Sequence, residues 1–115
     1  MAVFSVAQRV TVPSDAEGAI TLYPVRSAQK LTLKRVIFHF PTGTSFSVGL
    51  AIRRGIYSVC PEKGLVYGDD AVIELADDSV FDSGSTVGLY YVNEDPANDH
   101  QVLVVIEGEL VTNNE

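Results

Sequence analysis

The feature that most constrains the fold is an uninterrupted apolar run near the end of the chain, Val102-Leu103-Val104-Val105-Ile106. The run is much shorter than the roughly 20 residues that a membrane-spanning helix needs. Its β-branched residues favour a strand, and we expect that strand to be buried on both faces at the centre of a sandwich. The flanking pattern predicts two long strands, residues 85–93 and 100–111, joined by the acidic loop 94–99.

The remainder of the chain also has the pattern of short strands separated by turns. No segment shows a helical period, and a Gly or Pro turn recurs about every ten residues. The further predicted strands cover residues 3–12, 19–25, 30–40, 46–52, 56–59 and 71–75, and residues 80–84 lead back to the final pair. Seven to nine strands at this spacing predict an all-β, antiparallel sandwich or barrel. We expect one domain spanning residues 1–115, because no linker or internal repeat divides it.

Both ends of the chain and one proline suggest where the sheet edges lie. Residues 1–12 are expected to form an edge strand or an arm that pairs with a neighbouring subunit. Pro24 cannot donate a ladder hydrogen bond, so the predicted strand 19–25 should lie at an edge or end there. Residues 112–115 are polar and are expected to fray.

Three inner segments carry more specific expectations. Residues 13–18 should form a turn. Within residues 30–40 the apolar side changes near Arg35 and Val36, which indicates either a bulge or a strand that passes from one sheet's cover to the other's. Residues 46–52 alternate regularly and predict a strand with one buried face.

Charge and cysteine content limit the classes of partner. The chain has 15 acidic and 8 basic residues, a formal net charge of −7. We therefore expect no nucleic-acid partner, because a phosphate backbone is bound by clustered Lys and Arg. Cys60 is the single cysteine, so no intrachain disulfide can form. Residues 1–5 lack the basic and apolar regions of a secretory signal, which predicts synthesis and assembly inside a cell without a membrane partner.

The sequence contains no recognisable catalytic or cofactor-binding constellation. His39 and His100 are the only histidines and stand outside any His-x-His motif, whereas a cupin-type metal site needs several converging histidines. Cys60 has no histidine nearby in sequence to activate it, so we expect a packed, inert thiol. These patterns predict a protein that is not an enzyme and holds no cofactor.

Two other groups of residues are candidates for binding. Asp69, Asp70, Asp95 and Asp99 could hold calcium if their loops meet at one end, although Asp and Asn are also ordinary loop residues. The five tyrosines could form a sugar-stacking platform, but Tyr90 and Tyr91 should point to opposite faces of one strand, and packing is the alternative role.

Partner contacts are predicted at two places in the chain. Phe4 and Val6 lie in the N-terminal edge strand, whose unpaired backbone groups can add to another sheet. Arg53 and Arg54 could dock against an acidic partner surface, and a solvated strand end explains them equally well.

Several segments between residues 31 and 111 resemble a pattern found in small jelly-roll structural proteins of tailed phages and archaeal viruses. The segments are LKRVIFHFPTG at residues 33–43, Gly68-Asp69-Asp70, Val92-Asn93-Glu94-Asp95 and His100-Gln101-Val102. In such proteins a strand runs into a Phe-Pro-x-Gly turn, a Gly-Asp turn opens a later strand, and a hairpin closes through an acidic, Asn-rich loop. The resemblance covers about two-thirds of the chain.

This resemblance implies a jelly roll of about eight strands and a virion structural role. It implies a cement, decoration, turret or vertex protein, made in the host cytoplasm and located in the virion. Its partners would be further copies of itself in a homo-oligomer and capsid or other virion proteins, with no active site. From the residues alone, a carbohydrate-binding or adhesion sandwich, with calcium as a candidate ligand-binding ion, is the alternative. A ligand module should gather Tyr and carboxylates around one concave site, whereas a lattice protein should show wide, flat contact surfaces.

Overall fold

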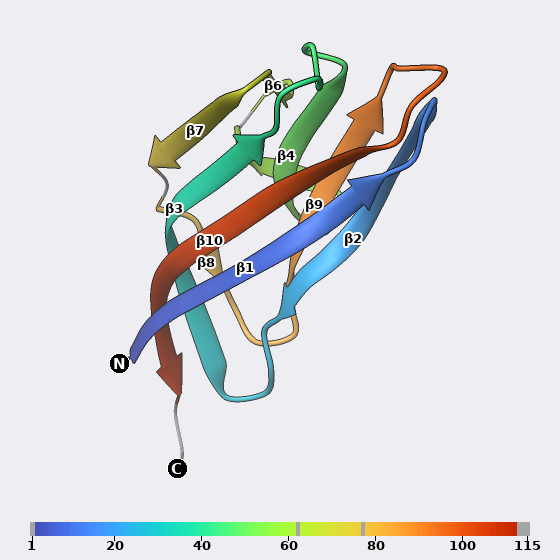
Figure 1. The fold of residues 1–115 in the computed structure, drawn as a ribbon. Coiled ribbons are helices and arrows are strands. Elements are labelled where there is room, and N and C mark those ends of the chain that lie inside the picture. Colours follow the sequence, from blue (N-terminus) through green and yellow to red (C-terminus); the bar gives the residue numbers. More distant parts are fainter. Residues whose placement is uncertain (1, 62, 77, 113–115) are drawn as a thin grey trace.

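Alternating apolar and polar side chains produce an all-β structure in which two antiparallel sheets face each other (Figure 1). The structure is a computed structural model that describes residues 2–61, 63–76 and 78–112. This part of the chain forms ten strands: β1 (Ala2–Val12), β2 (Ala16–Pro24), β3 (Gln29–Phe40), β4 (Val48–Arg54), β5 (Tyr57–Cys60), β6 (Val66–Tyr67), β7 (Ala71–Ala76), β8 (Val80–Phe81), β9 (Thr86–Asn93) and β10 (His100–Thr112). The same residues contain no helix that could span a bilayer.

The strand order is that of a jelly roll. Sheet A has the order β1-β10-β3-β7, with β8 also paired to β3. Sheet B has the order β2-β9-β4-β5, with β6 also paired to β4. The pairs β1–β10, β2–β9, β3–β7 and β4–β5 are nested around the turn at Gly55 and Ile56, as when one long hairpin is rolled up. The predicted antiparallel sandwich is therefore confirmed, with β5/β6 and β7/β8 as interrupted strands that bring the eight positions to ten strands.

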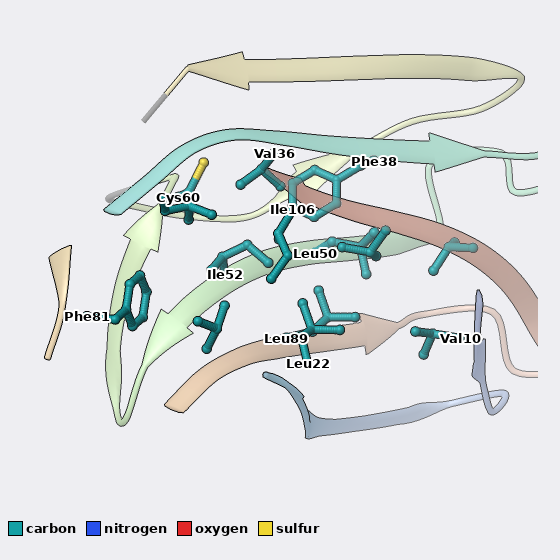
Figure 2. Close-up of a cluster of buried hydrophobic side chains, with 14 of the residues drawn as sticks. Val10, Leu22, Val36, Phe38, Leu50, Ile52, Cys60, Phe81, Leu89 and Ile106 are labelled. Atoms are coloured by element: carbon teal, nitrogen blue, oxygen red, sulfur yellow. The ribbon is translucent and has the colours of Figure 1, made fainter. Parts of the chain in front are cut away.

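The core lies between the two sheets and contains the inward face of β10. Figure 2 shows Ile106 from this strand beside Phe38, with Leu50 and Leu89 nearby from sheet B. β10 lies between β1 and β3 (Figure 1), so its central position is confirmed. The expectation that both of its faces are buried is wrong, because Leu103 and Val105 point away from the core and are only half-buried.

A β-bulge explains the change of apolar side in β3. The register with β10 shifts between Glu107 and Gly108, and Lys34 has no register partner there. Inward alternation resumes at Val36, so the strand stays in one sheet. A Cβ on Gly108 would lie 2.2 Å from the Thr32 carbonyl oxygen, so the bulge requires glycine at this position.

Several predicted boundaries need correction. β2 begins at Ala16, which shortens the predicted turn 13–18 to residues 13–15. β4 begins at Val48, because Phe46 has a φ of 58° and is 63% exposed. β4 is also buried on both faces between Val48 and Ile52, where one buried face was predicted. Residues 113–115 of the tail that was expected to fray lie outside the described residues, and Thr112 ends β10.

The edge strands are where the sequence predicted them. β1 is the outer strand of sheet A and pairs only with β10 within the described residues. β2 is an outer strand of sheet B, and Pro24 is its last residue. A proline is tolerated there because it ends the strand. Cys60 is buried at the end of β5, among the core residues of Figure 2.

Candidate interaction surfaces

The outer face of sheet A carries medium-sized apolar side chains that no third layer covers. The registers place Ala7, Val105, Ile37 and Glu74 in one row across β1, β10, β3 and β7, and Arg9, Leu103, His39 and Val72 in the next. We call Ala7, Ile37, Val72, Leu103 and Val105 the open face. Val72 is 65% exposed, Ala7 is exposed, and the other three are half-buried. Two depressions of about 370 and 550 Å³ lie at its ends.

Charged side chains border the open face. In the row after Ala7 and Val105, Arg35 of β3 lies between Glu107 of β10 and Ala76 of β7. Its guanidinium donates from Nε to Glu107 Oε1 at 2.6 Å and from Nη1 to Glu74 Oε1 at 3.1 Å. The hydrogen bond to Glu107, and then that to Glu74, raises the pKa of Arg35 above its ordinary value. An apolar centre with a polar rim is typical of a protein–protein interface.

The outer face of sheet B is covered by the chain itself over β4. Gly49 and Ala51 point outward from β4, yet both are buried. A Cβ on Gly49 would lie 2.7 Å from the ring of Tyr67 and 2.9 Å from a methyl of Leu65, so these two side chains cover the strand. Small residues on β4 thus leave room for large side chains, which shield this part of the face from solvent.

A second cluster extends the cover of sheet B across β9 and β2. The guanidinium of Arg53 lies 3.7 Å from the centre of the Tyr90 ring, a cation–π contact. The Tyr90 hydroxyl donates to Glu17, and this hydrogen bond is the main cause that raises the pKa of Tyr90 above 10.0. Tyr91 points to the opposite, inner face over Gly18, as the strand period predicted. One face of the Tyr90 ring is therefore occupied by Arg53.

Hydrogen bonds tie the loops at one end of the sandwich together. The buried amide of Asn93 donates to the carbonyl oxygens of Val12, Pro13 and Asn98 at 3.0–3.2 Å. The backbone N–H of Asp15 donates to the carbonyl oxygen of Asp95 at 2.9 Å. The β1–β2 and β9–β10 loops, each of which connects the two sheets, are therefore held in one arrangement.

Two of the predicted calcium ligands, Asp69 and Asp99, accept backbone hydrogen bonds from neighbouring loops. Asp69 accepts hydrogen bonds from the backbone N–H groups of Gly43 and Ser45, each at 3.0 Å. Asp99 accepts from the N–H of Ser14 at 2.9 Å, and Asp70 is exposed with a φ of 45°. Across residues 2–61, 63–76 and 78–112, no group of three or more His, Cys, Asp or Glu side chains is placed to hold a metal.

Asp95, the fourth predicted ligand, is a carboxyl group whose pKa is lowered by its neighbours. Its side chain accepts from the N–H groups of Ala97 and Asn98, and it lies 2.9 Å from Nε2 of His100. The backbone hydrogen bond from Ala97, followed by those of the His100 and Asn98 side chains, lowers the pKa of Asp95 from 3.8 to about 2.

The predicted partner residues make contacts within the chain. Phe4 is buried, and its ring packs edge-to-face on Tyr23 with the centroids 4.7 Å apart. Val6 is half-buried and packs against the core. Arg53 stacks on Tyr90, and Arg54 donates to the carbonyl oxygen of Val80 at 2.6 Å.

A contact of β1 with a partner would therefore use its backbone edge, which the sequence already suggested, and its outward side chains, which sequence reasoning did not single out. The outward residues of the open face were also missed. Their signal was present in the odd-numbered positions of the apolar run, Leu103 and Val105, which were assigned to a buried second face.

Comparison with known proteins gives one distant structural likeness. No protein-family model matches the sequence, and no curated protein matches it. Six chains among the solved structures match. One of them, from "Structure of infectious bursal disease virus Gx strain", has a TM-score of 0.43 and 12% identity, with 99% of this chain and 32% of that chain covered. The protein spans about a third of that viral chain, and a likeness at this level does not indicate function.

Proposed function

We propose that this protein is a non-enzymatic structural component of a virion, a capsid-associated cement, decoration or vertex protein that acts through protein–protein contacts. The jelly roll is compatible with this role, since viral capsid proteins use it, but lectins and cupins use it too. The fold alone therefore does not decide the function, which has to be inferred from the surface of the molecule.

The open face of sheet A is the observation that carries the proposal. Its five apolar residues come from four adjacent strands, the exposed His39 lies between Leu103 and Val72, and Arg9, Arg35, Glu74 and Glu107 border the face. Contiguous exposed apolar surface on a protein marks a site of interaction. A broad apolar face with a charged rim suits another protein, whereas a small ligand is held in a concave site with convergent polar groups.

The aromatic residues of sheet B support the carbohydrate alternative less well. A sugar stacks on an uncovered aromatic face, and Arg53 lies 3.7 Å from the centre of the Tyr90 ring. Tyr67 in turn packs on Gly49. Both rings already make contacts within sheet B. A sugar could stack on them only if these contacts were broken.

The proposal is tested by the composition of virus particles. Particles purified on a density gradient from cells that carry the gene should contain this chain in a fixed ratio to the major capsid protein, measured by mass spectrometry. A Val105→Lys variant, altered in the middle of the open face, should fold but be depleted from the particles.

Thr21→Lys is the matched control, because Thr21 is an exposed residue on the outer side of β2 in sheet B. This variant should enter particles as the wild type does. Absence of the wild-type chain from particles, or calcium-dependent binding on a glycan array, would contradict the proposed function.

A further inference from the structure

The edges of the two sheets differ in how they are protected against pairing with another chain. Natural edge strands are shortened, bulged, charged or ended by proline, because their unpaired N–H and C=O groups otherwise add to another sheet. β2 has a register shift between Thr21 and Tyr23 and ends at Pro24. On the other edges, β7 has 6 residues, β5 has 4, and β6 and β8 have 2 each.

β1 has none of these protections apart from one charged residue. It is 11 residues long, and its register with β10 runs from Ala2 to Val12 without a shift. Arg9 is its single charged residue, and the strand holds no proline. Val3, on its outward side, is 93% exposed. A long, regular and nearly uncharged edge is suited to strand addition.

The charge distribution favours a second copy of the chain as the occupant. The chain carries a net charge of −7, but β1 contains no acidic residue, so two β1 edges can approach with little repulsion. The neighbouring strand β10 provides acids on the same outward side, since Val3 is the register partner of Glu109 and Ser5 that of Glu107. Glu107 already binds Arg35, whereas Glu109 is exposed and has no polar partner among the described residues.

We propose that β1 pairs antiparallel with β1 of a second copy, about a two-fold axis at Val6, and joins the two A sheets into one continuous sheet. The inference rests on the proposed function, because it names the partner for one of the contacts of such a structural protein. The axis at Val6 places Arg9 opposite Val3 of the second copy. A two-fold axis repeats that contact, so the interface is isologous.

This register gives Arg9 an anionic partner. Val3 of the second copy lies beside its own Glu109, two strand spacings or about 10 Å from β1 of the first copy, within the combined reach of an arginine and a glutamate side chain. The depression of about 550 Å³ lined by Val3, Glu107 and Glu109 receives the guanidinium. The stem of Arg9 then covers the exposed Val3 side chain.

Charge reversal tests the pairing between chains. Within one chain, Arg9 and Glu109 lie six residues apart along the β1–β10 ladder, roughly 20 Å, too far for a direct contact. Arg9→Glu and Glu109→Arg should each leave the fold intact, as checked by circular dichroism and thermal melting. Each should weaken self-association at least about tenfold, because each places like charges at both symmetry-related contacts.

An equimolar mixture of the two variants tests whether residue 9 of one chain contacts residue 109 of the other. Arg9→Glu in one chain faces Glu109→Arg in the other, and the remaining Arg9 and Glu109 also face each other, so both contacts are attractive. Light scattering should find the wild type at an even multiple of the chain mass, each variant dissociated, and the mixture reassociated. Lys30→Glu, which changes the same charge on β3 away from this edge, should behave as the wild type.

A wild-type monomer, trimer or pentamer would overturn the inference. So would variants that stay associated, or a mixture that remains dissociated. If the β1–β1 pairing is not found but the chain is still present in particles, the proposed function is retained. Conversely, reassociation of the mixed variants with no chain in particles would retain the pairing and remove the virion role.

Discussion

The two outer faces of the sandwich differ in how far their outward-pointing side chains are covered by the rest of the chain. In sheet B, the outward positions of β4 are the small residues Gly49 and Ala51, which are both buried, Gly49 beneath Tyr67 and Leu65. In sheet A, the corresponding outward positions carry larger residues such as Ile37 and Val105, and these remain partly exposed. One face is closed within the chain, and the other is left open.

This difference separates residues that stabilise the monomer from residues available to a partner. A sandwich of two layers buries only the inner face of each sheet, so an apolar outer face needs a further cover. Sheet B obtains that cover from the segment around Leu65 and Tyr67. No described segment crosses the open face of sheet A, so its side chains remain accessible to a partner.

The largest expected effect comes from placing the same charged side chain on both faces. Ala51→Lys should lower the free energy of unfolding by roughly 3 kcal/mol or more, because lysine would overpack a fully buried site and bury a charge. Val105→Lys should cost less than about 1 kcal/mol, because its side chain can extend into solvent. Urea denaturation measures both. Similar losses for the two variants would contradict the assignment of one closed and one open face.

Much of this architecture could be predicted from strand alternation and turn residues. The period of two placed nearly every strand within a few residues, and the break near Arg35 and Val36 indicated the bulge in β3. The sandwich and its β1 edge followed from the same pattern. These features are local, so a single sequence contains them.

The covering of the faces could not be predicted, because it depends on contacts between distant segments. Val104 and Val105 have the same side chain, and only the pairing of β10 shows that one is buried and the other faces outward. Ala51 lies at a polar-facing position of the alternation, yet it is fully buried on the outer side of β4, where its register partner on β9 is Tyr90. Likewise Phe4 and Arg53 could not be recognised as internally engaged without Tyr23 and Tyr90 beside them.

A second, smaller effect follows from removing the cover of sheet B. Tyr67→Ala should lower the free energy of unfolding by roughly 2–3 kcal/mol, because it uncovers Gly49 and removes a packed aromatic ring. Tyr57→Ala is the matched control, since Tyr57 is 68% exposed on β5 and its loss should cost within about 0.5 kcal/mol. Thermal unfolding followed by circular dichroism compares them. Equal destabilisation would show that Tyr67 is not a structural cover.

The smallest effect concerns the loop that carries the chain from the closed sheet to the open one. The N–H of Ala97 and the side chains of His100 and Asn98 lower the pKa of Asp95 to about 2, so the folded state holds its carboxylate more firmly than the unfolded chain does. A depressed pKa contributes stability that is full above the ordinary value of 3.8 and is lost as the pH falls through about 2. Asp95→Asn should therefore be less stable than the wild type at pH 7, and the difference should shrink between pH 4 and pH 2.

Asp82→Asn, which alters an exposed carboxyl in the β8–β9 loop, should keep the wild-type pH profile. Urea midpoints across this range decide the question, and an Asp95→Asn difference that stays constant down to pH 2 would show that ionisation of Asp95 does not stabilise the junction of the two sheets.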